Sequence, residues 1–368
     1  QAEDGIRDTS HCLVGSEMCI RDSPWVVSGL ALVLMETLAD FGAVSIFNYD
    51  TFTTAIYKSW FGFFSLKAAA QLSSLLVLLA VSLVVIEGLF KKRMRYYDSS
   101  RGGAAQTRLK LSGWSSFMVV AYCSTILFVA FIAPLVQLTI WSLNVVGAGE
   151  GGAYLEVILK TLFLGASAAL IICLAAVLLA YSRRRNKSWS NRVLCRIATV
   201  GYALPGTVLA VGIFIPISRF DNLLRQAMET VLSIDPGPIF QGTLVAMLAA
   251  YLIRFLAVGF GAVDSGMQNI KPSLDEASAT LGRSGGETLT HIHFPLLKKS
   301  LLTALVLVLV DVIKEMPITL MTRPFGWDTL AVKIYELTSE GEWVRAALPG
   351  SYLVLAGIIP VILLINQM

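Results

Sequence analysis

The sequence has few of the residues from which metal, haem and disulfide sites are built. It holds 5 cysteines and 3 histidines in 368 residues, and no two cysteines have the C-x-x-C spacing. The cysteines at positions 123, 173 and 195 lie in or beside apolar stretches, so a zinc or haem site is not expected. The sequence also lacks a G-x-x-x-x-G-K-[ST] segment, the loop that cradles ATP phosphates. We therefore expect the chain to bind no cofactor of its own and to hydrolyse no ATP.

Charged residues are scarce as well. They make up 15% of the sequence, whereas soluble domains carry about 25%. Hydrophobic residues make up 55%, and the mean hydropathy is +0.70. Many apolar stretches reach the ~20 residues that a helix needs to cross a bilayer. The composition predicts an all-α polytopic membrane protein, with spans near residues 24–47, 67–90, 114–141, 155–181, 195–217, 239–263, 299–321 and 347–366.

The segment 1–23 differs from the rest of the chain. It is polar, follows no helical or strand period, and contains two of the five cysteines. It has neither the basic start nor the apolar stretch of a signal peptide. The segment looks like translated sequencing-adapter sequence, and the chain opens with Gln1 rather than methionine. We expect residues 1–23 to be a non-native tail and the remainder to be part of a longer protein.

Basic residues are distributed unevenly among the loops that connect the predicted spans. The loops after the second, fourth and sixth spans hold 17 lysines and arginines, and the alternate loops hold 6. Cytoplasmic loops of membrane proteins carry an excess of these residues. The loops around residues 91–110, 183–196 and 271–299 are therefore expected to be cytoplasmic. The net charge of +4 then reflects topology in a lipid bilayer, and no nucleic acid is expected as a partner.

Two stretches of the sequence resemble each other at a long interval. Glu36 and Asp40 are spaced i,i+4 within one apolar span, and Asp311 and Glu315 have the same spacing within a later span. Segments 50–57 and 328–335, which follow them, also match and both begin with Asp-Thr. The pattern predicts two tandem six-helix halves. Residues 24–90 would hold the last two helices of the first half, 91–113 a cytoplasmic linker, and 114–368 the second half, giving about 8 helices of 12.

The cytoplasmic loop at residues 264–298 contains signals for two short helices. Ser273 and Glu276 have the S-x-x-E spacing of a capping box, and so do Ser284 and Glu287. Gly282 lies between them and can end the first helix, because glycine tolerates the left-handed conformation at a helix C-terminus. We expect two short helices set at an angle by the bend at residues 283–286.

This loop resembles the EAA loop of binding-protein-dependent ABC import permeases. The family pattern is E-A-A, three residues, G, nine residues and I-x-x-P or I-x-L-P. The matching positions here are Glu276, Ala277, Ser278, Gly282, Ile292 and Pro295, with Ser278 in place of alanine and Phe294 in place of leucine.

The resemblance implies a type I ABC importer permease (MetI-like) fold in a multi-pass protein of the bacterial inner membrane. It implies that the loop docks on a cytoplasmic ABC ATPase dimer, which uses ATP and magnesium. It also implies that a periplasmic substrate-binding protein delivers the substrate. The chain would then be a transport subunit and not an enzyme.

Four further segments narrow the resemblance. Residues 38–42, 201–206, 251–256 and 316–320 (LADFG, GYALPG, YLIRFL and MPITL) are similar to the fused, two-half permeases of ferric iron importers. This implies ferric iron as the substrate, while thiamine, polyamine and phosphonate permeases share the architecture and stay open as alternatives. A secondary transporter would not need the EAA spacing. An intramembrane enzyme would need a nucleophile or metal constellation at depth, and no histidine lies within any apolar stretch.

Ionisable residues within apolar spans are costly and usually face the interior of a helix bundle. Glu36, Asp40, Asp311 and Glu315 are of this kind, and so is Arg254. One hypothesis is that these residues line a translocation path, where carboxylate oxygens contact ferric iron transiently. The alternative is that the carboxylates pair with Arg254 or with backbone groups and hold helices together. Both interpretations stay open at this point.

Overall fold

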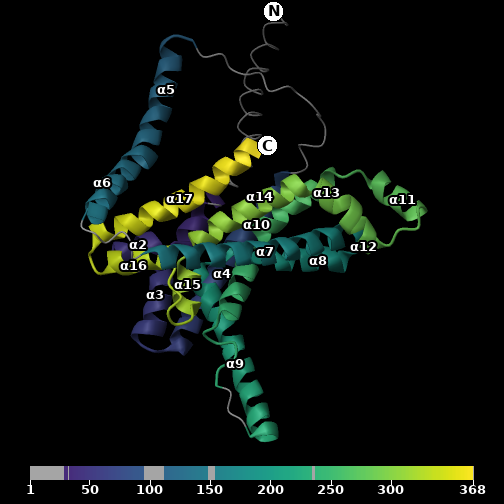
Figure 1. The fold of residues 1–368 in the computed structure, drawn as a ribbon, viewed down its shortest axis with the longest axis horizontal. Coiled ribbons are helices and arrows are strands. Elements are labelled where there is room, and N and C mark those ends of the chain that lie inside the picture. Colours follow the sequence, from purple (N-terminus) through teal and green to yellow (C-terminus); the bar gives the residue numbers. More distant parts are fainter. Residues whose placement is uncertain (1–28, 32, 95–111, 148–153, 234–236, 368) are drawn as a thin grey trace, which may run out of the picture.

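The computed structural model describes residues 29–31, 33–94, 112–147, 154–233 and 237–367, which are helical almost throughout (Figure 1). Within these ranges six helices are long and apolar enough to cross a membrane: Leu66–Ile86, Trp114–Gly147, Leu155–Arg185, Gly206–Val231, Leu244–Asn269 and Trp343–Asn366. They confirm the spans predicted near 67–90, 114–141, 155–181, 239–263 and 347–366. The interpretation of residues 1–23 concerns residues outside the described ranges.

The helices follow one another in two groups. The N-terminal group is α2 (Gly42–Ile46), α3 (Phe52–Tyr57), the π-helical turn η1 (Lys58–Gly62) and α4 (Leu66–Met94). The second group opens with α5 (Trp114–Leu127), η3 (Phe128–Ile132), α6 (Ala133–Gly147), α7 (Leu155–Arg185), α8 (Trp189–Ala198), η5 (Val200–Ala203), α9 (Gly206–Leu232) and α10 (Leu244–Asn269). It continues with α11 (Pro272–Thr280), α12 (Gly285–Thr288), η6 (Leu289–His293), α13 (Phe294–Leu296), α14 (Lys298–Ile313), α15 (Pro317–Thr322), α16 (Leu330–Ser339) and α17 (Trp343–Gln367).

The centre of the fold is a three-helix core formed by α7, α10 and α14, which pack against one another along their lengths. Their buried side chains are mostly aliphatic and small, so the helix backbones approach closely. Gly259 of α10 shows how closely: a Cβ at this position would lie 3.0 Å from a side-chain carbon of Ile172 in α7. α17 packs against α6, and α5 continues from α6 away from the rest of the described chain (Figure 1).

Three predicted spans are interrupted in the structure, and a proline explains two of the interruptions. The span expected at 195–217 starts only at Gly206, because Leu204 is extended before Pro205 and the preceding residues form α8 and η5. The span expected at 299–321 is broken into α14 and α15, since Pro317 cannot donate the hydrogen bond that would continue α14. Within the span expected at 24–47, the described residues 33–39 are helical and are likewise followed by a break before α2.

The N-terminal group packs against the second group through its short helices as well as its long one. α4 contacts α9, α3 contacts α9, and α2 contacts α16. Ile56, Ala69 and Leu76 are buried together with Val211 and Met321. The described part of the first half therefore shares a continuous apolar interface with the second half.

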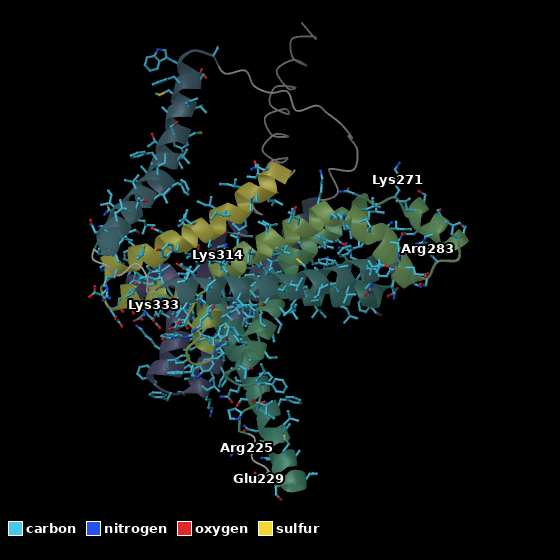
Figure 2. All side chains as sticks on the ribbon, viewed as in Figure 1. Arg225, Glu229, Lys271, Arg283, Lys314 and Lys333 are labelled. Atoms are coloured by element: carbon cyan, nitrogen blue, oxygen red, sulfur yellow. The ribbon has the colours of Figure 1, made fainter. Side chains whose placement is uncertain are left out.

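The predicted cytoplasmic loop and α16 lie at opposite ends of α7 (Figure 1). Lys271 and Arg283 lie on the projecting loop, and Lys333 lies at the far end of the molecule (Figure 2). This arrangement agrees with the alternation of basic residues, which puts the loop in the cytoplasm and α16 on the other side of the membrane.

Candidate functional site

The predicted coupling loop is helical, but its first helix does not start where the sequence suggested. α10 extends to Asn269, within the segment assigned to the loop, and α11 begins at Pro272 with Lys271 as its N-cap residue. The capping box predicted for Ser273 and Glu276 is therefore wrong. Proline at the first helical position already has the φ angle of a helix, so the helix starts there and Ser273 becomes an internal residue.

Gly282 ends α11 in the predicted manner. Its φ angle is +72°, in the left-handed region. The Gly282 N–H donates to the Ala279 carbonyl and the Arg283 N–H donates to the Ser278 carbonyl, which together form a Schellman motif. A side chain here would strain the backbone, so the bend between α11 and α12 depends on this glycine.

The second predicted capping box is present at the start of α12. The Ser284 N–H donates to Oε2 of Glu287 at 2.7 Å, and the Glu287 N–H donates to Oγ of Ser284 at 3.4 Å. Hydrogen bonding to the Ser284 backbone keeps the pKa of the exposed Glu287 carboxyl below its usual range. The ionised carboxylate therefore holds this helix start in place at neutral pH.

The residues of the EAA pattern divide into an exposed set and a buried one. Glu276, Ala277 and Pro295 are exposed and Ile292 is half-buried. Ser278 is buried, and its hydroxyl lies 2.7 Å from that of Thr288, so it joins α11 to α12 inside the loop. Several apolar side chains are exposed on the same loop, namely Leu274, Leu281, Phe294 and Leu296. Besides Glu287, whose carboxylate caps α12, the loop thus presents the carboxylate of Glu276 and an apolar surface outside the spans, which is the composition of a protein interface.

A second set of loop residues, which the sequence pattern did not reveal, attaches the loop to the membrane helices. Asp275 in α11 accepts a 2.7 Å hydrogen bond from Nε of Arg184 at the end of α7. Its other oxygen lies 2.6 Å from Nε2 of His293, which is fully buried. Burial opposes ionisation of Asp275, but the hydrogen bonds from Arg184 and His293 outweigh it and keep the pKa of this carboxyl below its usual range. Arg184 and Asp275 are 91 residues apart, so no local spacing could have predicted this pair.

The inner members of the two acidic pairs have the same local role. Oδ1 of Asp40 accepts a 3.4 Å hydrogen bond from the Ala43 N–H at the start of α2. Oε1 of Glu315 accepts a 3.2 Å hydrogen bond from the Ile318 N–H at the start of α15. In both repeats the donor lies at position i+3 from the carboxylate, so the two carboxylates stabilise equivalent helix starts.

Glu315 has a further partner in Arg254. Nε of Arg254 lies 3.5 Å from Oε2 of Glu315, and the two side chains are 15% and 7% exposed. Gly206 leaves the space for this pair, because a Cβ there would lie 2.5 Å from the guanidinium and 2.8 Å from the carboxylate. These contacts match the alternative in which the acidic residues hold helices together.

The outer members of the acidic pairs lie around Lys314 and Tyr202. Nζ of Lys314 is 2.8 Å from Oδ1 of Asp311, and most of the Lys314 side chain is exposed. Asp311 and Glu36 both lie near enough to interact electrostatically with Tyr202 and with Lys314. Glu36 and Asp311 are equivalent residues of the two repeats, so the structure brings together one carboxylate from each half.

Other equivalent residues of the repeats touch one another directly. Tyr57 and Tyr335, which end the matching segments 50–57 and 328–335, have ring centroids 6.4 Å apart. Phe41 lies between them, at 5.4 Å from Tyr57 and 5.7 Å from Tyr335. Phe41 and its equivalent Met316 are both buried in this cluster. Residues that contact their own equivalents lie where the two repeats meet, so this aromatic cluster marks the place where a pseudo-twofold axis between the halves would run.

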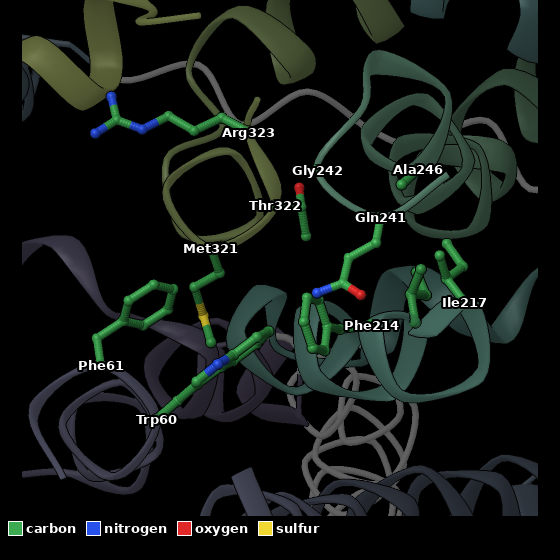
Figure 3. Close-up of a pocket in the computed structure, with 11 residues that line it drawn as sticks. Trp60, Phe61, Phe214, Ile217, Gln241, Gly242, Ala246, Met321, Thr322 and Arg323 are labelled. Carbon is green, nitrogen blue, oxygen red and sulfur yellow. The ribbon is translucent and has the colours of Figure 1, made fainter. Parts of the chain in front are cut away.

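A small pocket opens beside the cluster, between Trp60 and Phe61 of the first half and Phe214, Gln241 and Met321 of the second (Figure 3). Its volume is about 240 Å³. Arg323 also borders it, but its guanidinium is bound to Asp328 and Glu336 and extends away from Gln241 (Figure 3).

No acidic residue lines this pocket, so it does not have the oxygen ligands that a ferric ion prefers. Among the described residues, no three side chains of histidine, cysteine, aspartate or glutamate lie close enough together to hold a metal ion.

Comparisons with known proteins bear on the family and the fold. The family model described as "Binding-protein-dependent transport system inner membrane component" matches residues 172–366. A solved bacterial ABC transporter that imports the acidic polysaccharide alginate has a similar fold, with a TM-score of 0.52 and 15% identity, over 69% of this chain and 93% of that one. The fold class predicted from the sequence is thereby confirmed, and the chain is a multi-pass inner-membrane protein.

Three curated relatives illustrate the similarity. The Fe(3+)-transport system permease protein FbpB 2 of Haemophilus influenzae is 25% identical over 345 residues, which is 93% of this chain and 65% of the relative. The ferric transport system permease protein FbpB of Actinobacillus pleuropneumoniae is 25% identical over 303 residues, 77% of this chain and 42% of the relative. A Salmonella typhimurium protein named for 2-aminoethylphosphonate transport, PhnV, is 28% identical over 191 residues, 52% of this chain and 66% of the relative. The chain thus spans less than two thirds of the length of each.

Proposed function

Because the chain belongs to the family of binding-protein-dependent transport system inner membrane components, we propose that it is the permease of a bacterial ABC importer for ferric iron. The observation that supports ferric iron as the substrate is the extent of similarity to ferric permeases, which reaches 93% of the chain and so includes both halves. The chain acts as a transport subunit, binds no cofactor and catalyses no reaction. ATP and magnesium are used by a partner.

That partner is a cytoplasmic ABC ATPase dimer, which docks on the coupling loop. The exposed Glu276 and Ala277 of α11, with the apolar side chains around Leu281, form the contact surface. Ser278 and Gly282 fix the angle between α11 and α12 from inside the loop, and Ile292 and Pro295 lead back to α14. When the ATPase dimer closes on ATP, it moves this surface and with it the membrane helices.

The translocation path follows the pseudo-twofold axis between the two halves. Glu36 and Asp311 contribute one carboxylate from each half, and hard oxygen ligands suit ferric iron. Lys314 neutralises Asp311 while no substrate is present. Asp40, Glu315 and Arg254 stabilise the helix starts beside the path and so keep those helices in position.

The aromatic cluster of Phe41, Tyr57, Met316 and Tyr335 closes this path on the periplasmic side, since it lies on the axis at the end opposite the coupling loop. A periplasmic substrate-binding protein docks over that end and delivers the ion when the cluster parts. A solved structure similar in fold (TM-score 0.50) was obtained "in complex with alginate pentasaccharide-bound periplasmic protein", which supports this arrangement.

A 2-aminoethylphosphonate importer is the second candidate, and Lys314 is the observation that favours it. Its side chain is 63% exposed beside the axis, where it could attract an anionic phosphonate. The similarity to PhnV, however, covers only 52% of the chain, whereas the similarity to ferric permeases extends through both halves. Glu36 also brings a second carboxylate to the same position, which disfavours an anion.

Uptake by the reconstituted transporter tests the proposal. The full-length permease is placed in liposomes with its ATPase, and the binding protein is supplied with radioactive ferric iron or with 2-aminoethylphosphonate. We expect ATP-dependent accumulation of iron and none of the phosphonate. Accumulation of phosphonate alone would overturn the proposal that ferric iron is the substrate. Iron uptake that continues without ATP would overturn the proposal that the protein belongs to an ATP-driven importer.

A further inference from the structure

The connection between α10 and the coupling loop has the geometry of a hinge. Ile270 and Lys271, which join α10 to α11, are both extended, with ψ angles of 121° and 136°. The two extended residues interrupt the helical backbone between Asn269 and Pro272, so α11 could pivot there. A loop that pivots would absorb any movement that the ATPase imposes on it. Some other contact must hold α11 to the membrane helices if force is to pass.

Arg184 bridges this joint from the end of α7. Its Nη1 donates to the carbonyls of Met267 and Ile270 at 2.6 and 2.9 Å, and its Nε donates to Asp275 beyond the joint. A cation is favoured at the C-terminus of α10 by the helix dipole. The planar guanidinium serves acceptors on both sides at once, which a lysine could not do.

His293 forms the second bridge, from the far side of the loop. Its Nε2 is bonded to Asp275 in α11, and its Nδ1 lies 3.1 Å from Sδ of Met267 in α10. The ring also packs edge-on against Tyr181 of α7. The Tyr181 hydroxyl in turn donates a 2.7 Å hydrogen bond to the Gly285 carbonyl in α12. The exposed neighbour His291 makes none of these contacts with α7 or α10.

We propose that Arg184, Asp275 and His293 are positioning residues that lock the coupling loop to the ends of α7 and α10. Movement of the docked loop then turns the α7–α10–α14 core instead of bending the chain at residues 270 and 271. The three residues act behind the docking surface, because none belongs to its exposed set. The inference rests on the proposed docking of the ATPase on this loop.

The test separates docking from transmission in the full reconstituted transporter. Asp275→Asn and His293→Gln are compared with His291→Gln, which changes an exposed histidine two residues away. Three quantities are measured: the ATPase that co-purifies, ATP hydrolysis stimulated by the loaded binding protein, and substrate accumulated per ATP. We expect normal co-purification in all three variants. Accumulation per ATP should fall about tenfold in the first two, a typical size for coupling between sites, and stay unchanged in His291→Gln.

Two further variants make the interpretation specific. Arg184→Lys keeps the positive charge but loses the planar guanidinium that donates to acceptors on both sides of the joint. It should therefore reduce accumulation per ATP as Asp275→Asn does. The double variant Asp275→Asn with His293→Gln should lower accumulation per ATP by less than the product of the two single effects, since the two side chains share the Asp275–His293 contact. Wild-type accumulation per ATP in both single variants would overturn the proposal. Loss of the ATPase from the complex would also overturn it, because the residues would then maintain the docking surface itself. Failure of the docking proposal has a different signature, namely an unchanged ATPase association after Glu276→Lys.

Discussion

Replacing Glu315 by alanine removes both interactions that its carboxylate makes at the break between α14 and α15. The Ile318 N–H loses its acceptor, and Arg254 loses its counter-ion. Nε and Nη1 of Arg254 have no other hydrogen-bond partner among the described residues. The variant therefore leaves a buried cation and a buried N–H group unpaired.

The loss in free energy of unfolding for Glu315→Ala follows from the geometry of the pair. Removing one partner of a buried ion pair destabilises a protein by about 3–5 kcal/mol. The separation of 3.5 Å is longer than in a hydrogen-bonded pair, so we expect a loss near the lower end, about 3 kcal/mol. Glu315→Gln keeps an oxygen for the Ile318 N–H and loses only the charge, so its loss should be about half as large.

The assay is the apparent melting temperature of the purified permease in detergent, at one fixed heating rate because large membrane proteins unfold irreversibly. The expected order of melting temperature is wild type, then Glu315→Gln, then Glu315→Ala. Glu340→Ala is the matched control, since that carboxylate is exposed, and it should melt like wild type. A Glu315→Ala variant that also melts like wild type would refute the structural role assigned to the Arg254–Glu315 pair.

Two further predictions concern helix packing and the axis. Gly201→Ala should sharply reduce the amount of folded permease, because its Cβ would lie 2.0 Å from the Ile253 carbonyl oxygen. Gly212→Ala is the control and should be neutral, since a Cβ there would have no atom within 4 Å. Equal expression of the two variants would contradict the packing described for Gly201. Glu36→Gln combined with Asp311→Asn should slow iron uptake while ATPase association stays normal, and unaltered uptake kinetics would remove these residues from the path.

Much of the fold could be predicted because its signals are local. Apolar stretches longer than ~20 residues specify spans wherever a proline does not interrupt them. Two of the three interrupted spans fail at Pro205 and Pro317, where the apolar stretch continues although the helix does not. Hydropathy reports composition and not backbone hydrogen bonding, so it could not predict these breaks in the helices.

The candidate site was predicted in part for a similar reason. The left-handed turn at Gly282 and the capping box at Ser284 depend on a few consecutive residues, and both are present in the structure. The contacts of Asp275 with Arg184 and of Glu315 with Arg254 join residues distant in the sequence. Spacing cannot specify such contacts, since they depend on how α7, α10 and α14 pack.

The most direct test of the account is a charge reversal on the exposed face of α11. Glu276→Lys changes a side chain outside every span, so the permease should reach the membrane at its normal level. Glu340→Lys, an equivalent reversal at the opposite end of the molecule, is the control. ATPase association is measured by co-purification over a range of ATPase concentrations. We expect Glu276→Lys to weaken association about tenfold or more, since a misplaced charge in an interface is costly, and Glu340→Lys to leave it unchanged. Equal association in both variants, with normal stimulated ATP hydrolysis and uptake, would contradict the claim that this loop receives the ATPase.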